Sequence, residues 1–154
     1  MLQFIIDGYN LVHKIPDIKN SSVPCHELLS FLHKNKLTGS LKNKVLVVFD
    51  GGKPPYQINN FHYKVLFSYQ ESADDLIIAK IKQFQNKKQI VVVTDDRELR
   101  YRAQSLEAQT CSVDDFMAKA RRIKPEQGEK EINYSLQREI TEEMKRIWLD
   151  DNKS

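Results

Sequence analysis

Residues 44–50 read KVLVVFD, and this stretch decides the fold. Five consecutive apolar residues, three of them valines, end in an aspartate that two glycines follow. A solid apolar run of this length, rather than an alternation of apolar and polar residues, is typical of a strand that is buried on both faces. The stretch therefore predicts an inner strand of a sheet that helices cover on both sides.

The same pattern recurs along the chain. Residues 2–6 and 89–94 are also apolar runs, and they end at Asp7 and at Asp95-Asp96. Further elements are expected in these ranges: short strands over residues 63–67 and 110–113, and helices over residues 24–37, 73–84, 97–106 and 114–122. Strands that alternate with helices in this way predict a three-layer α/β fold with a mainly parallel central sheet.

The pattern of apolar residues changes beyond residue 125. Apolar residues recur there at every third or fourth position in an otherwise charged stretch: Ile132, Leu136, Ile140, Met144, Ile147 and Trp148. This spacing predicts one long amphipathic helix over about residues 130–149. We expect the helix to dock on the rest of the domain, because an exposed stripe of large apolar side chains favours aggregation.

The composition indicates one globular domain over residues 1–154, with its core over about residues 2–122. The chain has 154 residues, 40% of them hydrophobic and 29% charged, which suffices for one core but hardly for two. The apolar runs are too short to span a bilayer, and residues 1–7 lack the basic start of a secretory signal. We therefore expect a cytoplasmic or organellar-matrix protein. Cys25 and Cys111 are too far apart for a C-x-x-C pair, which predicts two reduced thiols.

Acidic residues gather at one end of the predicted elements. Asp7, Asp50, Asp95 and Asp96 follow strands, and Asp74 and Asp75 begin a helix. The carboxyl ends of parallel strands meet at one edge of an open sheet, where ligands bind. Carboxylates that converge there repel one another unless a cation neutralises them, and hard oxygen ligands suit Mg²⁺ or Mn²⁺. The pattern predicts a divalent-metal site at this edge.

Each acid also has a purely structural interpretation. Asp7 and Asp50 precede glycines and could form turns. Ser72 and Asp75 fit a capping box, which is the preferred interpretation of Asp75, and Asp95 could cap the helix that follows it. The metal site depends on the whole set, because chance seldom places acids at three strand ends and one helix start.

Other kinds of site fit less well. The sequence has no G-x-x-x-x-G-K-[ST] loop, no G-x-G-x-x-G after a strand and no G-x-S-x-G elbow. A phosphatase that forms an aspartyl phosphate would need a second carboxylate two positions after Asp7, where Tyr9 stands. The histidines show no metal-binding spacing and are expected to be surface or hydrogen-bonded residues: His13, His26, His33 and His62.

Four motifs together resemble a known family. They are Asp7-Gly8-Tyr9-Asn10, VVFDGG at residues 47–52, SADDLI at residues 72–77 and VVTDDR at residues 92–97. In this order and spacing, over about residues 2–120, the chain is similar to the YacP-type NYN domains of the PIN-like nucleases. The resemblance implies a PIN-like α/β fold, a divalent metal and endoribonuclease activity. It also implies a link to the decay of mRNA on ribosomes.

The resemblance implies roles for single residues as well. By motif position, the acidic site consists of Asp7, Asn10, Asp74 and Asp96, with Asp50 and Asp75 as supporting metal ligands. Asp95 replaces the Ser or Asn usual at its position, which leaves open whether Asp95 or Asp96 faces the metal. Because a metal can activate water for attack on a phosphodiester, no catalytic histidine is required. The catalytic residues are expected to be Asp7, Asp74 and Asp96.

A tyrosine and several basic residues are candidates for contact with RNA. Tyr9 could stack on a base, and Lys53 and Arg97 flank the acidic strand ends. The densest basic segment includes Arg121 and Arg122. The net charge of +3 permits a polyanionic partner without demanding one. We expect mRNA and the ribosome as partners, and neither DNA nor a membrane.

Three classes of function stay open at this point. The leading one is a metal-dependent endoribonuclease that acts on single-stranded or ribosome-bound mRNA. The alternative is a non-catalytic RNA- or ribosome-binding module, in which the acids only cap helices. A phospho-acceptor domain built on Asp50 fits least, because the first strand ends in a single aspartate rather than an acidic pair.

Overall fold

The computed structural model describes residues 1–39 and 42–123, the last five of them by their backbone alone. Within these residues, five strands form one parallel sheet in the order β3-β2-β1-β4-β5. The strands are β1 (Gln3–Asp7), β2 (Lys44–Phe49), β3 (Lys64–Phe67), β4 (Ile90–Val93) and β5 (Gln109–Cys111). The chain steps outward from β1 to β3 on one side and from β4 to β5 on the other. The switch in direction lies between β1 and β4, where such sheets open a crevice.

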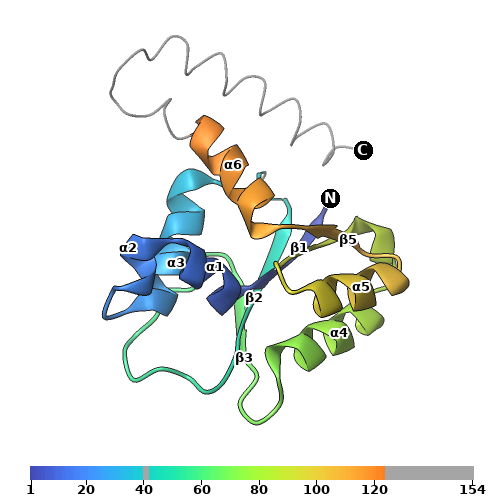
Figure 1. Cartoon of the computed structure of the whole chain (residues 1–154), viewed down its shortest axis with the longest axis horizontal. Helices are drawn as coiled ribbons and strands as arrows, with labels where there is room; N and C mark the ends of the chain where they lie inside the picture. The colour runs from blue at the N-terminus through green and yellow to red at the C-terminus, as the bar shows by residue number, and fades with distance from the viewer. Residues whose placement is uncertain (40–41, 124–154) are drawn as a thin grey trace.

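Helices cover both faces of the sheet (Figure 1). The helices are α1 (Gly8–Lys14), α2 (Pro16–Lys19), α3 (Pro24–Asn35), α4 (Ala73–Gln83), α5 (Arg97–Ser105) and α6 (Val113–Ile123), with a 3₁₀ helix η1 (Lys87–Gln89) before β4. Phe4 and Ile6 of β1 pack into a cluster with side chains of α1, α3 and α6, whereas Ile5 packs with side chains of α4 and α5. Successive strand residues point to opposite faces, so the solid apolar runs supply both layers. The three-layer α/β prediction is confirmed.

The segment after β1 differs from the prediction. A turn was the structural interpretation of the Asp7-Gly8 pair, but α1 begins at Gly8 directly after the strand. A Cβ atom on Gly8 would lie 2.5 Å from two atoms of the Phe49 ring, which is fully buried. This glycine therefore serves close packing of α1 against β2 rather than a turn. Helices of only four and seven residues, as α2 and α1 are, are too short to show a periodic apolar stripe.

Helix α2 and the 3₁₀ helix η1 were not predicted either, and the remaining described elements lie within a few residues of their predicted positions. Cys25 and Cys111 form no disulfide, as expected. The long helix predicted over about residues 130–149 lies outside the described residues. None of the described helices is both long and apolar enough to cross a bilayer.

Candidate active site

Acids from three elements line one hollow at the carboxyl end of the sheet. Asp7 closes β1, Asp50 directly follows β2, and Asp74 lies in the first turn of α4. The hollow, called the acidic hollow below, has a volume of about 360 Å³ and is open to solvent. Its lining consists of Asp7, Tyr9, Asn10, His13, Asp50, Ser72, Ala73 and Asp74. The sheet therefore brings together residues that are more than sixty positions apart in the sequence.

Asp7 is the buried member of this group, with 9% of its surface exposed. Its Oδ2 accepts a hydrogen bond of 3.0 Å from Oγ1 of Thr94, a fully buried residue that follows β4. Burial, together with the charges of Asp74 and Asp96, raises the pKa of Asp7 to about 6, although the hydrogen bonds from Thr94 and the Asn10 backbone oppose this shift. A bound cation would favour the charged carboxylate and would therefore lower the pKa of Asp7.

Asp74, which lines the hollow, lies beside Asp96. Burial, the charge of Asp96 and a hydrogen bond with Asp96 all raise the pKa of Asp74. Asp96 is also the N-cap of α5, because its Oδ1 accepts a hydrogen bond of 3.1 Å from the Leu99 backbone. Oγ1 of Thr94 accepts a hydrogen bond of 3.1 Å from the Asp96 backbone, while it donates to Asp7. Thr94 thus fixes Asp7 and the start of α5 to one another.

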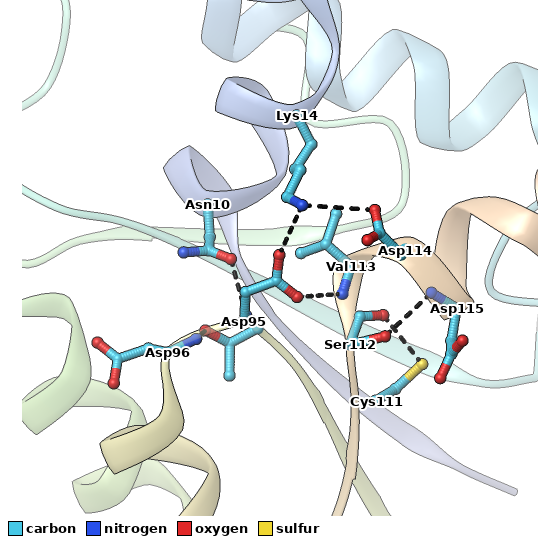
Figure 2. Close-up of polar contacts among 10 residues, drawn as sticks. Asn10, Lys14, Asp95, Asp96, Cys111, Ser112, Val113, Asp114 and Asp115 are labelled. Atoms are coloured by element: carbon cyan, nitrogen blue, oxygen red, sulfur yellow. Dashed lines mark hydrogen bonds and ion pairs between the residues drawn. The ribbon is translucent and has the colours of Figure 1, made fainter.

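Asp95 faces away from these acids. Its Oδ1 accepts a hydrogen bond of 2.8 Å from the Val113 backbone, and its Oδ2 lies 3.3 Å from Nζ of Lys14 (Figure 2). The prediction that Asp95 caps the helix after it is wrong, because Asp96 caps α5 and Asp95 binds the first residue of α6. Figure 2 shows the Asp96 side chain directed away from Asp95. Of the pair, Asp96 is the residue that adjoins Asp7 and Asp74.

Asn10 links the hollow to this neighbouring network. Its Oδ1 accepts a hydrogen bond of 2.8 Å from the Asp95 backbone (Figure 2). With the amide oxygen engaged in this way, the Nδ2 group is the part of Asn10 that is best suited to meet a ligand, and it is a donor. Asn10 therefore fits contact with a phosphate oxygen better than contact with a metal ion.

The two supporting acids have protein partners. Oδ1 of Asp50 accepts hydrogen bonds from the Ala73 backbone at 3.0 Å and from Ser68 Oγ at 3.3 Å, which ties the end of β2 to the start of α4. The Asp75 side chain, 62% exposed, forms an ion pair of 3.2 Å with Arg102 and so joins α4 to α5. Ser72 caps α4 by accepting a hydrogen bond from the Asp75 backbone, as the capping motif predicts. Asp50 thus lines the hollow, whereas the Asp75 carboxylate is engaged beside it.

The candidate RNA contacts lie at different distances from the hollow. Tyr9 lines it, although its ring also packs edge-on against Phe49 and its hydroxyl lies 3.2 Å from Sγ of Cys25. Arg97 is exposed and follows Asp96 directly. The remaining candidates lie elsewhere: Lys53 lines a separate groove beside β3, and Arg121 and Arg122 belong to α6, where the side chains are outside the described part of the structure.

Sequence reasoning missed two residues of the site. His13 is an exposed residue, as expected, and it also lines the acidic hollow, with its ring edge-on to Tyr9 at 6.4 Å. His13 is four positions after Tyr9 and three after Asn10, so it adjoins both on the surface of α1. The residue was missed because this helix was not predicted. Thr94 gave no signal, since a threonine at the end of a strand is common and its role depends on long-range contacts.

The donor set fits a hard divalent cation. In the described part of the chain, no group of three or more Asp, Glu, His or Cys side chains is placed so that it could hold a metal ion. Mg²⁺ does not need one, because it commonly takes one or two carboxylates and completes its coordination with water and substrate phosphates. Asp7 and Asp74, which line the hollow together and repel one another, are suitable ligands of this kind.

Comparison with known proteins places the chain in a family. Residues 4–153 match the model of the YacP-like NYN domain. The protein belongs to the YacP-like NYN domain family. This match confirms the resemblance that the four motifs indicate. The family is of the ribonuclease type. Among curated proteins, none matches this sequence.

Two solved structures are similar to this NYN domain. The crystal structure of Rae1 (YacP) from Bacillus subtilis has 22% sequence identity and a TM-score of 0.67, over 99% of this chain and 90% of that chain. The W164L mutant of the same protein has 22% identity and a TM-score of 0.62, over 99% of both chains. At this level of identity the likeness concerns the fold, and it supports the parallel α/β architecture described above.

Proposed function

We propose that this protein is a divalent-metal-dependent endoribonuclease that hydrolyses phosphodiester bonds in single-stranded RNA. One observation carries the proposal: Asp7, Asp74 and Asp96 converge at the carboxyl end of a parallel sheet, in a chain of a ribonuclease-type family. We propose mRNA as the substrate and the ribosome as a further partner, on the family resemblance. The hollow is open to solvent, which favours cleavage within a strand because a polynucleotide can pass across it.

The residues of the hollow have separate roles in this reaction. Bound Mg²⁺ or Mn²⁺ supplies the Lewis acid that activates water and offsets charge on the phosphate. Asp7 and Asp74 would hold the ion, and the negative charge of Asp96 beside them would strengthen the attraction of the site for a cation, although it raises the pKa of both carboxyls when no metal is bound. Thr94 orients Asp7 through its hydrogen bond to Oδ2. Nδ2 of Asn10 donates to a phosphate oxygen and holds the strand in place.

The proposal is tested by cleavage of an unstructured, end-labelled RNA by the full chain in Mg²⁺, in Mn²⁺ and in EDTA. We expect internal cleavage with either metal and none in EDTA. Asp7→Asn should lower the rate by about 100-fold or more, because loss of a ligand exceeds the 10- to 100-fold cost of losing a residue that only orients one. Asp17→Asn, which removes an exposed carboxylate from α2, serves as the matched control. Cleavage that persists in EDTA, or an Asp7→Asn variant with the wild-type rate, would overturn the proposal.

The second candidate is a non-catalytic RNA-binding module. One observation favours it: Asp50 and Asp96 already accept hydrogen bonds from the starts of α4 and α5, so each has a structural role without any metal. This candidate predicts salt-sensitive RNA binding in EDTA and no cleavage in any metal. The same assay separates the two functions.

A further inference from the structure

A second hollow lies at the opposite end of the sheet. It is lined by residues from the starts of β1, β2 and β3 and from the last turns of α3 and α4, and its volume is about 980 Å³. Six of its lining residues define what we call the basic groove: His33, Lys36, Lys44, His62, Lys64 and Lys80. No aspartate or glutamate lines it in the described part of the chain.

The four lysines of the groove have no carboxylate partner within the described residues. The ion pairs found there join Lys14 to Asp95 and Asp114, and Arg102 to Asp75, all away from the groove. Like charges that gather around one hollow raise the local positive potential, because nothing nearby cancels it. Such a groove attracts anions.

Helix dipoles account for only part of this charge. Lys36 is the C-cap of α3 and Lys80 lies in the last turn of α4, where cations are stabilised by the negative end of a helix. Lys44 and Lys64 are the first residues of β2 and β3, where no helix ends. A lysine at the edge strand β3 can also prevent unwanted strand pairing, but β2 lies inside the sheet. Neither argument explains Lys44.

The groove has a fixed floor and aromatic walls. Asn43, which is buried, donates from Nδ2 to the Thr38 carbonyl at 2.8 Å and accepts from the Leu2 backbone at 2.9 Å. The ring of His33 stacks on Phe61 at 4.4 Å and lies 6.0 Å from the ring of His62. Tyr63 and Phe84 also line the groove and are partly exposed. Cations beside planar rings are the combination that binds single-stranded nucleic acid, because lysines contact phosphates and rings stack on bases.

We propose that the basic groove binds the phosphate backbone of single-stranded RNA, at a site separate from the acidic hollow. The inference rests on the proposed function for its choice of RNA over another polyanion. Strands of four to six residues separate the two ends of the sheet by roughly 13–20 Å. One RNA strand can therefore contact both ends of the molecule, with the groove holding it while the hollow cleaves it.

The test measures binding by the full chain to a fluorescent oligouridylate of about 16 nucleotides, in EDTA so that no RNA is cut. Lys44→Gln with Lys64→Gln is compared with a matched control, Lys19→Gln with Lys82→Gln, which removes two exposed lysines outside the groove. At 0.1 M salt we expect about 10-fold weaker binding for the groove variant and less than about twofold for the control. The slope of log affinity against log salt should fall by about 1.4, because each lost phosphate contact removes about 0.7.

Each other outcome overturns a defined part of the proposal. Wild-type RNA affinity in the groove variant, with both variants folded by thermal melting, would show that the groove binds no RNA. Competition by polyglutamate as strong as competition by unlabelled RNA would make the groove an acidic-peptide site. Failure of the proposed function has a different signature, namely no cleavage by the wild type in Mg²⁺ or Mn²⁺ while binding through Lys44 and Lys64 persists.

Discussion

The acidic hollow and the basic groove lie at opposite ends of one parallel sheet, and helix ends match their charges. Asp7, Asp74 and Asp96 stand where α1, α4 and α5 begin, and two groove lysines stand where α3 and α4 end. Helix dipoles favour this arrangement in any protein of this class, so the sign of the charge alone does not identify a site. Two features that helix dipoles do not explain indicate function. They are the burial of Asp7 at the hollow and the position of Lys44 on an inner strand at the groove.

The largest expected effect separates the chemistry of the hollow from the binding of the groove. Asp96→Asn should lower kcat by about 100-fold and change KM little, because it weakens the hold of the acidic hollow on the metal ion and removes no contact with the RNA. The Lys44→Gln, Lys64→Gln variant should raise KM about 10-fold on a long RNA and leave kcat within about twofold. Steady-state kinetics on one RNA substrate gives both values. A lowered kcat in the lysine variant would show that the two ends of the sheet do not act separately.

The next effect concerns the packing of α1, which carries three residues of the hollow, against β2. Gly8→Ala should lower the free energy of unfolding by about 2 kcal/mol, because its Cβ would overlap the Phe49 ring, which is packed between Tyr9 and Phe67. Gly52→Ala is the matched control, since its Cβ would meet only the Tyr69 ring at 3.8 Å, an ordinary contact. Chemical denaturation measures both. Equal stability of the two variants would show that Phe49 moves aside and that Gly8 is not needed for close packing.

Gly8 also shows where prediction from sequence ends. The apolar runs identify the strands, and parallel strands bring Asp7, Asp50 and Asp96 to one edge without any knowledge of strand order. The helix that follows Asp7 was not predictable, because α1 is too short for a periodic pattern and its glycine resembles a turn signal. His13 was missed for the same reason.

The remaining misses depend on contacts that are distant in sequence. The placement of the Asp95 side chain depends on Val113 and Lys14, which bind its carboxylate. The lysines of the basic groove come from four separate parts of the chain. Two of them stand at the amino ends of strands, whereas ligand sites in parallel sheets are expected at the carboxyl ends. No local pattern carries such information.

The burial of Asp7 predicts a pH effect on the metal-free protein. The pKa of Asp7 is about 6 in the folded chain, against an ordinary value of 3.8, which we take for the unfolded chain. The stability that protonated Asp7 contributes is therefore fully present below pH 3.8 and is lost as the pH rises through 6. Asp7→Asn cannot titrate at this position. The variant should therefore gain about 2 kcal/mol relative to wild type between pH 4 and pH 7 in EDTA, measured by chemical denaturation. A difference that does not change with pH would show that Asp7 titrates normally.

The smallest effect tests whether the hollow, and not the groove, takes the metal. A ligand stabilises the folded state by RT ln(1 + [L]/Kd), so Mg²⁺ or Mn²⁺ at about ten times its Kd should add about 1.4 kcal/mol and raise the melting temperature of the wild type. Asp7→Asn should show little of this shift, because it loses a ligand to the ion. The Lys44→Gln, Lys64→Gln variant should show all of it, because cations have no favourable contact in a groove that no carboxylate lines in the described residues. If the metal shifts all three proteins equally, the ion binds elsewhere, and Asp7 is a buried acid with a structural role.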